Sequence, residues 1–203
     1  MKIGNIGLGI IGRTLGKKWV NAGHNVKFGV RNTDKEEYKS FVNSLGNNAT
    51  LSDIKESINY GEIIIVAIPG NAVQEFFKTY AKDLSNKIII DLTNKMGARV
   101  TNSLEHFKEF VENAEYYRAF NNMGWENFDN PKFGSDIADL FYCGTNKEGQ
   151  KKVEELIKDV GLNPISLGGL ERIANVDGVG ALWFTLSMGQ KYGRHFAFKV
   201  LRD

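Results

Sequence analysis

Three glycines near the start of the chain have the spacing of a phosphate-binding loop. Gly7, Gly9 and Gly12 form the pattern G-x-G-x-x-G between an apolar run and a helical pattern, which is the context in which this pattern binds a dinucleotide. The first glycine permits a tight turn, the second lets backbone approach a pyrophosphate, and the third lets helix and strand pack closely. The pyrophosphate would lie at the helix N-terminus, where backbone N–H groups favour an anion. The residues expected to bind it are Gly7, Leu8, Gly9, Ile10, Ile11 and Gly12.

The end of the second predicted strand indicates which nicotinamide cofactor binds. An NAD site places Asp or Glu there to accept hydrogen bonds from the ribose 2′-hydroxyl. This chain instead reads Gly-Val-Arg-Asn-Thr-Asp-Lys over residues 29–35. The Arg31 guanidinium can make paired charge-assisted bonds to a 2′-phosphate, with Lys35 as a second, more mobile cation. We therefore expect NADP, against the alternative of a solvated loop with ordinary basic residues.

Apolar runs that alternate with helical patterns define the elements that position these residues. The predicted strands are Ile3–Leu8, Asn25–Val30, Ala49–Leu51, Glu62–Ile68, Lys87–Asp91, Glu115–Ala119, Asp139–Cys143 and Pro164–Ile165. The predicted helices include Ile11–Ala22, Asp34–Leu45, a short helix capped by Ser52, Asn71–Leu84, Ser103–Asn113 and a helix that Gly161 ends. This alternation predicts a Rossmann-type α/β fold with a doubly wound parallel sheet. We expect an NADP-binding domain at residues 1–166 and a short C-terminal helical segment at 167–203 that completes the site or a dimer interface.

Ligands of such sheets bind outside the carboxyl ends of the strands. The loops Gly7–Gly12, Arg31–Lys35, Ala67–Gly70 and Leu92–Lys95 should therefore share one crevice. A further polar and aromatic loop, Phe120–Phe128, follows the sixth predicted strand, and loops of this kind are often functional. Besides the glycine loop, the predicted cofactor-binding residues are Val30, Arg31, Asn32, Lys35, Ala67, Ile68, Pro69, Thr93, Asn94, Ala119, Phe120 and Asn121.

Composition excludes several other classes of protein. The net charge of +2 implies no general polyanion-binding surface, and one cysteine excludes an intramolecular disulfide framework. No apolar run approaches the ~20 residues of a membrane span, so a soluble, cytoplasmic protein without a nucleic-acid or membrane partner is expected. The sequence shows no metal-ligand spacing and no acid–base pair. We therefore name no catalytic or metal-binding residue, and expect Cys143 in the core and His24 in a solvated turn.

The C-terminal segment does not continue the strand–helix alternation. Phe184, Met188, Tyr192 and Phe196 recur every four residues, which predicts a helix with an aromatic stripe. Such a stripe can pack on the domain or form a dimer or ligand surface, because aromatic residues serve core and interface alike. Both possibilities stay open.

Taken together, these motifs resemble the coenzyme F420-dependent NADP oxidoreductase family over essentially the whole chain. The resemblance is carried by Gly-Leu-Gly-Ile-Ile-Gly, Gly29-Val30-Arg31, Ala67-Ile68-Pro69, Arg118-Ala119-Phe120-Asn121 and Gly-Arg-His-Phe-Ala-Phe-Lys over residues 193–199. It implies a small, usually homodimeric Rossmann protein that passes hydride between NADP and a deazaflavin. It also implies 2′-phosphate contacts at Val30, Arg31 and Lys35, and a nicotinamide-side strand end at Ala119.

Two features depart from the family pattern. The family often has Thr and Asn between the first glycines, whereas Leu8, Ile10 and Ile11 are apolar here, which leaves phosphate binding to backbone N–H groups. The segment Phe-Asn-Asn-Met-Gly-Trp after Ala119 resembles a wider branch that includes the cytosolic domains of membrane ferric reductases, which use flavin. The second ring partner could therefore be F420 or FMN/FAD.

Two alternative functions remain on the sequence evidence. A reductase of a small carbonyl or imine substrate shares the first domain, but usually needs a substantial helical second domain, and the residues after Leu167 are few for that. A non-catalytic NADP-sensing module would use the same glycine fingerprint. If the protein is an enzyme, hydride passes directly between nicotinamide and the acceptor, so the protein mainly supplies position and electrostatics.

Overall fold

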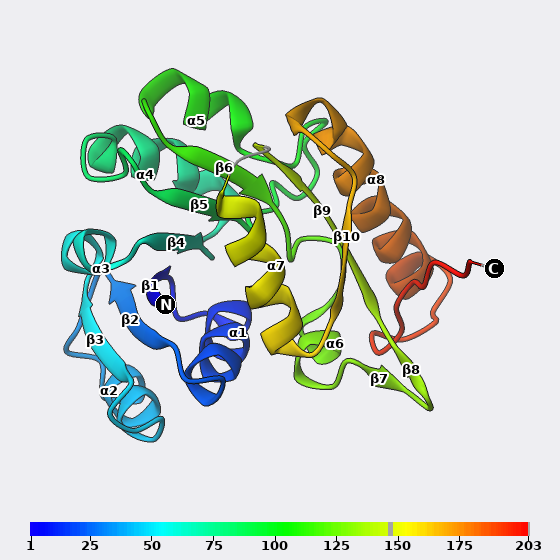
Figure 1. Ribbon diagram of the computed structural model, residues 1–203, viewed down its shortest axis with the longest axis horizontal. Helices are drawn as coiled ribbons and strands as arrows, with labels where there is room; N and C mark the ends of the chain where they lie inside the picture. The colour runs from blue at the N-terminus through cyan, green and yellow to red at the C-terminus, as the bar shows by residue number, and fades with distance from the viewer. Residues whose placement is uncertain (146–147, 203) are drawn as a thin grey trace. The chain divides into compact units, whose positions relative to one another are not determined.

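The computed structural model describes residues 1–145 and 148–202, which form two compact units, Met1–Tyr116 and Tyr117–Asp203 (Figure 1). The predicted domain boundary between residues 166 and 167 stays a prediction. The first unit contains β1 (Lys2–Ile6), α1 (Ile10–Asn21), β2 (Asn25–Val30), α2 (Glu36–Asn43), β3 (Ala49–Asp53), α3 (Ile54–Tyr60), β4 (Ile63–Val66), η1 (Gly70–Ala72), α4 (Val73–Tyr80), β5 (Ile88–Asp91), α5 (Leu104–Phe110) and the start of β6 (Glu115–Arg118). The second contains the end of β6, α6 (Trp125–Asp129), β7 (Lys132–Phe133), β8 (Asp136–Ile137), β9 (Asp139–Gly144), α7 (Gly149–Val160), β10 (Asn163–Ser166), η2 (Leu170–Arg172), α8 (Ile173–Phe184) and the π-helical turn η3 (Thr185–Gly189).

The sheet of the first unit has the order β5-β4-β1-β2-β3, and all of these strands are parallel. Ile3 of β1 lies opposite Val26 of β2 and Ile63 of β4. All four residues of β4 are buried, as expected for a parallel strand that is covered on both faces. The parallel arrangement brings the carboxyl ends of the strands, and the loops that follow them, to one edge of the sheet.

Helices cover both faces of this sheet, and two glycines permit their close approach. A Cβ atom on Gly16 of α1 would lie 2.3 Å from Cε1 of Phe28 in β2. A Cβ atom on the neighbouring Gly29 would lie 2.7 Å from Cβ of Ser57 in α3. Because successive residues of a strand point to opposite faces, α1 and α3 lie on opposite sides of β2. The sheet is therefore doubly wound, as the sequence predicts.

The cap of α3 is displaced by one residue from the predicted position. The Asp53 carboxylate, rather than the Ser52 hydroxyl, accepts a hydrogen bond from the Glu56 backbone N–H at 2.8 Å. Ser52 instead lies within β3, where it is buried, and its hydroxyl donates to the Asp53 carbonyl at 2.9 Å. The prediction of Ser52 as the cap is therefore wrong, because the strand extends through Asp53.

In the second unit, β9 pairs with β10 in parallel and with the end of β6 in antiparallel orientation. Over the described residues the chain thus has a mostly parallel, eight-stranded sheet that alternates with helices. This is a Rossmann-like α/β fold with C-terminal helices. The antiparallel pairing of β6 with β9 departs from the fully parallel sheet that the sequence predicts. A short hairpin of β7 and β8 lies outside this sheet. Within the described residues, no helix has the length and apolar character that a membrane span needs.

The C-terminal segment differs from the predicted helix. Helical structure ends at Gly189, and Tyr192 and Phe196 follow in irregular chain. Lys191 and Gly193 adopt left-handed φ angles of 60° and 81°, which a right-handed helix cannot continue through. The helix predicted to carry Tyr192 and Phe196 is therefore wrong. Phe196 instead stacks on Trp183 with ring centroids 5.3 Å apart, and the Trp183 indole N–H donates to the Phe196 carbonyl at 3.0 Å.

The predictions for Cys143 and His24 have opposite outcomes. Cys143 is fully buried, and burial raises the pKa of its thiol to about 12, so it is a core residue as expected. His24 is also buried, with Nδ1 at 3.0 Å from the amino group of Met1. The expectation of a solvated turn at His24 is wrong. The Asn25 N–H donates to the Met1 carbonyl, so pairing of β1 with β2 brings His24 beside the amino terminus.

Candidate functional site

Two of the three fingerprint glycines are required by the packing of the first unit itself. Gly7 has a φ of 105°, and a Cβ atom there would lie 2.4 Å from the carbonyl oxygen of Ala67. A Cβ atom on Gly12 would lie 2.2 Å from the carbonyl oxygen of Gly7. Both distances are shorter than real Cβ contacts, so these positions need glycine whether or not a ligand binds.

Gly9 is different, since nothing in the fold requires glycine there. Its φ is −70°, which any residue adopts, and a Cβ atom would have no heavy atom of the described residues within 4 Å. Gly9 is the N-cap of α1 and has no side-chain cap, so the first N–H groups of the helix lack the usual capping oxygen. An open cradle of backbone at a helix N-terminus fits a pyrophosphate, and therefore fits the predicted dinucleotide.

Contacts of glycines bring the loops after β1, β4 and β5 together with the end of β2. The Gly7 N–H donates to the Gly29 carbonyl at 3.0 Å, so the turn after β1 lies beside β2. The close approach of Gly7 to Ala67 connects it to the loop after β4. A Cβ atom on Gly70 would lie 2.7 Å from the carbonyl oxygen of Asn94, in the loop after β5. The predicted residues that share this edge of the sheet are Val30, Arg31, Asn32, Lys35, Ala67, Ile68, Pro69, Thr93 and Asn94.

The loop after β2 presents the two cations expected at the 2′-phosphate. Arg31 is exposed and makes no hydrogen bond or ion pair with any residue in 1–145 or 148–202. The side-chain oxygen of Asn32 accepts from the Asp34 N–H at 2.8 Å, which orders the turn. Nζ of Lys35 lies 5.1 Å from the centre of the Tyr38 ring. The Arg31 guanidinium is thus available for an anion, although its binding role stays a prediction.

Arg13, on the first turns of α1, is a functional candidate that the sequence reasoning missed. Its Nε donates to the Leu8 carbonyl at 2.9 Å, and its guanidinium pairs with Glu37 of α2 at 2.5 Å. The same guanidinium lies 5.5 Å from the Tyr38 ring and 5.4 Å from the Phe41 ring. Arg13 therefore fixes the glycine loop to α2. Its place one residue after Gly12 is the only signal for it in the sequence.

Asp91, the last residue of β5, is a second residue that was missed. Its fully buried carboxylate accepts from the N–H and hydroxyl of Thr93 at 2.8 and 2.7 Å. It also accepts from the N–H and hydroxyl of Ser103 at 3.2 and 2.7 Å, and from the Tyr116 hydroxyl at 2.5 Å. Asp91 thus fixes both ends of the segment between β5 and α5. A carboxylate that ends an otherwise apolar strand was the available signal.

In the second unit, the predicted residues Ala119, Phe120 and Asn121 directly follow Arg118, which forms an ion pair with α8. Nε of Arg118 donates to Oδ1 of Asp177 on α8 at 2.9 Å, and the Arg118 side chain is fully buried. The Asn121 amide donates to the same carboxylate oxygen at 3.1 Å. Ala119 and Phe120 are buried, and Phe120 has a left-handed φ of 59°. This ion pair orders the strand end, while cofactor binding by Ala119, Phe120 and Asn121 stays a prediction.

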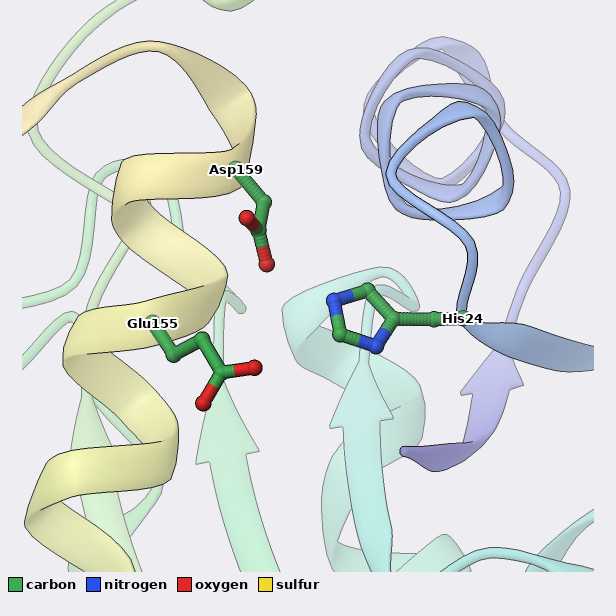
Figure 2. Close-up of side chains that lie close together, drawn as sticks. All are labelled: His24, Glu155 and Asp159. Atoms are coloured by element: carbon green, nitrogen blue, oxygen red, sulfur yellow. The ribbon is translucent and has the colours of Figure 1, made fainter.

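Figure 2 shows three side chains of types that ligate metals: Glu155 and Asp159, one turn apart on α7, and His24 after α1. Glu155 and Asp159 belong to the second unit, whereas His24 belongs to the first. We therefore assign no metal site to them.

Comparisons with known proteins agree with this geometry. Residues 2–95 match the family model described as NADP oxidoreductase, coenzyme F420-dependent. The chain is 24% identical over 187 residues to the rat (Rattus norvegicus) metalloreductase STEAP3. The aligned region covers 88% of the chain and 36% of that relative. The chain therefore spans about a third of the length of this curated relative.

Solved structures share the fold. The crystal structure of a candidate F420-dependent NADP reductase from Arthrobacter sp. FB24 has a TM-score of 0.82 at 20% identity, with both chains covered completely. An imine reductase variant from Myxococcus stipitatus, solved with NAD+, has a TM-score of 0.66 at 15% identity, with 94% of this chain and 61% of that chain covered. The resemblance found in the motifs is thus confirmed over residues 2–95, which match the model of the coenzyme F420-dependent NADP oxidoreductase family.

Proposed function

We propose that the protein is an NADP-dependent oxidoreductase that passes hydride between NADP(H) and a second ring, either the deazaflavin F420 or a flavin, FMN or FAD. The observation that carries the proposal is Gly9. This glycine faces open space at the N-terminus of α1, at a position where neither φ nor packing demands glycine. A ligand that needs close backbone approach explains it.

In this proposal, the residues of the chain bind the cofactor and orient it toward the acceptor. The N–H groups at the start of α1 hold the pyrophosphate, Arg31 and Lys35 hold the 2′-phosphate, and Arg13 fixes the glycine loop. When it is bound, nicotinamide supplies the hydride chemistry, which needs the reacting atoms about 3–3.5 Å apart. We place the acceptor-side wall in residues 119–125, where Asn121 and Asn122 can hydrogen-bond ring carbonyls or the carboxamide. No side chain is assigned to proton transfer.

The first experiment separates cofactor binding from folding. Gly9→Ala should weaken NADP binding at least about tenfold, because the added Cβ occupies the cradle, while the melting temperature of the apo protein stays nearly constant. Gly178→Ala in α8 is a matched control, since its Cβ also meets no described atom within 4 Å, and it should leave NADP affinity unchanged. Wild-type NADP affinity in Gly9→Ala would refute the placement of the pyrophosphate.

The second experiment tests NADP selectivity. Arg31→Ala should weaken NADP binding by about 1.5–3 kcal/mol, the scale of hydrogen bonds to a charged group, and leave NAD binding nearly unchanged. Lys17→Ala, which removes an exposed cation of α1, serves as the control. Equal losses for NADP and NAD would contradict the 2′-phosphate assignment.

The third experiment identifies the acceptor. NADPH oxidation is followed with F420, FMN and FAD, and turnover with any of them separates an enzyme from a sensor of NADP. Asn121→Ala should lower this turnover more than it lowers NADP affinity. A collapse of NADP affinity at unchanged turnover would move Asn121 to the phosphate side and leave the acceptor wall elsewhere.

The likeness to the imine reductase fold favours a second candidate, the NADPH-dependent reduction of a small imine or carbonyl compound. NADPH oxidation with a ketone and an amine, in the absence of flavin and F420, tests it. We further propose a homodimer in the cytoplasm, which sedimentation and cell fractionation test.

A further inference from the structure

Asn5 is a fully buried polar residue in the middle of the parallel sheet of the first unit. It lies in β1, opposite Phe28 of β2 and Ile65 of β4. Parallel strands that are covered on both faces are usually apolar throughout, and Ile3 and Ile6 of the same strand follow this rule. The packing of the sheet alone therefore gives no reason for an asparagine at this position.

The Asn5 amide connects the two ends of the glycine loop. Its Nδ2 donates to the Gly7 carbonyl at 3.0 Å and to the Gly12 carbonyl at 3.4 Å. A Cβ atom on the preceding residue, Gly4, would lie 2.5 Å from the Ser57 carbonyl oxygen in α3. Because successive residues of a strand point to opposite faces, Asn5 points to the face that α1 covers. One buried side chain thus holds the turn after β1 against the first turn of α1.

The Asn5 side chain is only partly satisfied. Its Oδ1 is buried and accepts no hydrogen bond from any residue in 1–145 or 148–202. A buried acceptor without a partner lowers stability relative to an apolar group of the same shape. Asn5 therefore combines a loss of folding free energy at one atom with a service to the glycine loop at the other. This combination is expected of a residue that has a function.

Donors of the first unit occupy the other carbonyl groups of the glycine loop as well. Nε of Arg13 donates to the Leu8 carbonyl at 2.9 Å, and the Arg13 N–H donates to the Gly9 carbonyl at 3.0 Å. With Asn5 on the Gly7 carbonyl, three successive carbonyl oxygens are thus turned toward the protein. A carbonyl oxygen turned outward would repel a pyrophosphate, since both are negative. The arrangement leaves N–H groups at the helix N-terminus for the anion.

We infer that Asn5 is a positioning residue for the pyrophosphate of NADP(H). Its NH2 group holds the Gly7 carbonyl away from the cradle at Gly9, so the loop already has the shape that the anion needs. A site that is ordered in advance binds more tightly, because binding does not have to order it. The inference rests on the proposed function and adds to its cofactor site a residue outside the glycine fingerprint.

The test compares ligands that share the adenosine but differ in the pyrophosphate. NADP and NAD both have a pyrophosphate, whereas adenosine 2′-monophosphate has the 2′-phosphate alone. Equilibrium binding of all three, and the melting temperature of the free protein, are measured for wild type, Asn5→Val and Asn5→Ser. Ser57→Ala is the matched control, because the buried Ser57 hydroxyl also donates to a backbone carbonyl, that of Lys27 at 2.7 Å, on the α3 side of the sheet.

We expect Asn5→Val to weaken NADP and NAD binding about tenfold each, the scale of one lost hydrogen bond, with adenosine 2′-monophosphate within about twofold of wild type. Its melting temperature should fall no more than that of Ser57→Ala, because the unpaired oxygen is removed together with the donor. Asn5→Ser keeps one shorter donor and should recover part of the affinity. Ser57→Ala should bind all three ligands nearly as the wild type does.

Wild-type affinity for NADP in both Asn5 variants would overturn the inference. An equal loss for adenosine 2′-monophosphate would also overturn it, since the substitution would then disturb the whole unit. If Asn5→Val does not fold, Asn5→Ser decides by the same contrast between NADP and adenosine 2′-monophosphate. Because binding is measured without an acceptor, an intact contrast without turnover would contradict the proposed function alone.

Discussion

Each unit of the molecule fixes a carboxylate that is fully or largely shielded from water, Asp91 at 0% and the Asp177 side chain at 14% exposure, and the two units do so by different means. In the first unit, Asp91 accepts hydrogen bonds from neutral donors, which are backbone N–H groups and hydroxyls of Thr93, Ser103 and Tyr116. In the second unit, Asp177 faces the fully buried guanidinium of Arg118, with the Asn121 amide as a further donor.

This difference predicts different responses to substitution. A carboxylate among several neutral donors loses one hydrogen bond at a time, at moderate cost. A buried ion pair loses its balance when either partner is removed, because the remaining charge stays in a medium of low dielectric constant. Removing the donors of Asp91 one by one should therefore lower the free energy of unfolding in steps. Removing either Arg118 or Asp177 should remove the whole stabilising effect of the ion pair between the end of β6 and α8 at once.

The largest expected effect comes from breaking the ion pair. Arg118→Met keeps an apolar stem but leaves the Asp177 charge without its guanidinium, so the free energy of unfolding should fall by about 3–5 kcal/mol. Urea denaturation measures the loss. The double variant Arg118→Met/Asp177→Leu should be more stable than Arg118→Met, since buried pairs can be replaced by apolar residues. A double variant as unstable as the single one would show that packing, rather than charge, sets the cost.

The next largest loss of unfolding free energy is expected at Asp91, in the first unit. Asp91→Asn keeps the shape of the side chain but replaces one acceptor oxygen with an NH2 group. This NH2 donor would face N–H and hydroxyl groups that themselves donate. The free energy of unfolding should fall by about 2–3 kcal/mol, measured by the same denaturation. Asp34→Asn, at an exposed position, should change it by less than about 0.5 kcal/mol. An Asp91 loss no larger than that of the control would mean that the network does not anchor the loop.

A single donor can also be removed from Asp91. Tyr116→Phe deletes the hydroxyl but keeps the ring, whose centroid lies 4.9 Å from that of Phe107. We expect a loss of about 1.5 kcal/mol in the free energy of unfolding. Hydrogen exchange of the 92–103 loop should quicken only slightly, because Thr93 and Ser103 still hold it. A loss as large as that of Asp91→Asn would show that this anchor is not graded.

The smallest effect concerns a partly exposed carboxylate, Glu154 of α7, to which the Tyr142 hydroxyl donates. This hydrogen bond lowers the pKa of Glu154, and burial raises the pKa of Tyr142 to about 12, so the phenol stays a donor at neutral pH. A lowered carboxyl pKa stabilises the fold above the unfolded pKa, and the contribution is lost as pH falls through the folded value. Tyr142→Phe should therefore cost less than about 1 kcal/mol near neutral pH and almost nothing at the acid end. Denaturation at several pH values checks this, and a pH-independent difference would contradict it.

The sequence allowed prediction of the parts of the fold that depend on neighbours along the chain. Apolar runs such as that ending at Val66, and the spacing of Gly7, Gly9 and Gly12, are local signals, and the strands and the loop follow them. The Asp91 network could not be predicted in the same way. Its donors Ser103 and Tyr116 lie 12 and 25 residues away, so only the folded sheet brings them together.

The failed predictions have the same cause. The four-residue periodicity from Phe184 to Phe196 was real, but tertiary contacts took Phe196 out of the helix and onto Trp183. His24 follows a helix-ending glycine, as an exposed turn residue would, yet strand pairing buries it beside Met1. Arg118 was included in the family resemblance, whereas its partner Asp177 lies 59 residues farther on, in an otherwise largely apolar helix.

The stacking of Phe196 on Trp183 also gives the molecule an optical reporter. Trp183 is 1% exposed, its ring lies within 9° of parallel to Phe196, and its indole N–H is occupied by a backbone carbonyl. Release of the irregular C-terminal segment that carries Phe196 would expose this indole to water, so its emission would shift to longer wavelength. In a Trp125→Phe background, which removes the third indole of the chain, Trp19, buried in the other unit, would keep its blue emission. The two spectral components would then distinguish local release of the tail from unfolding of the whole chain.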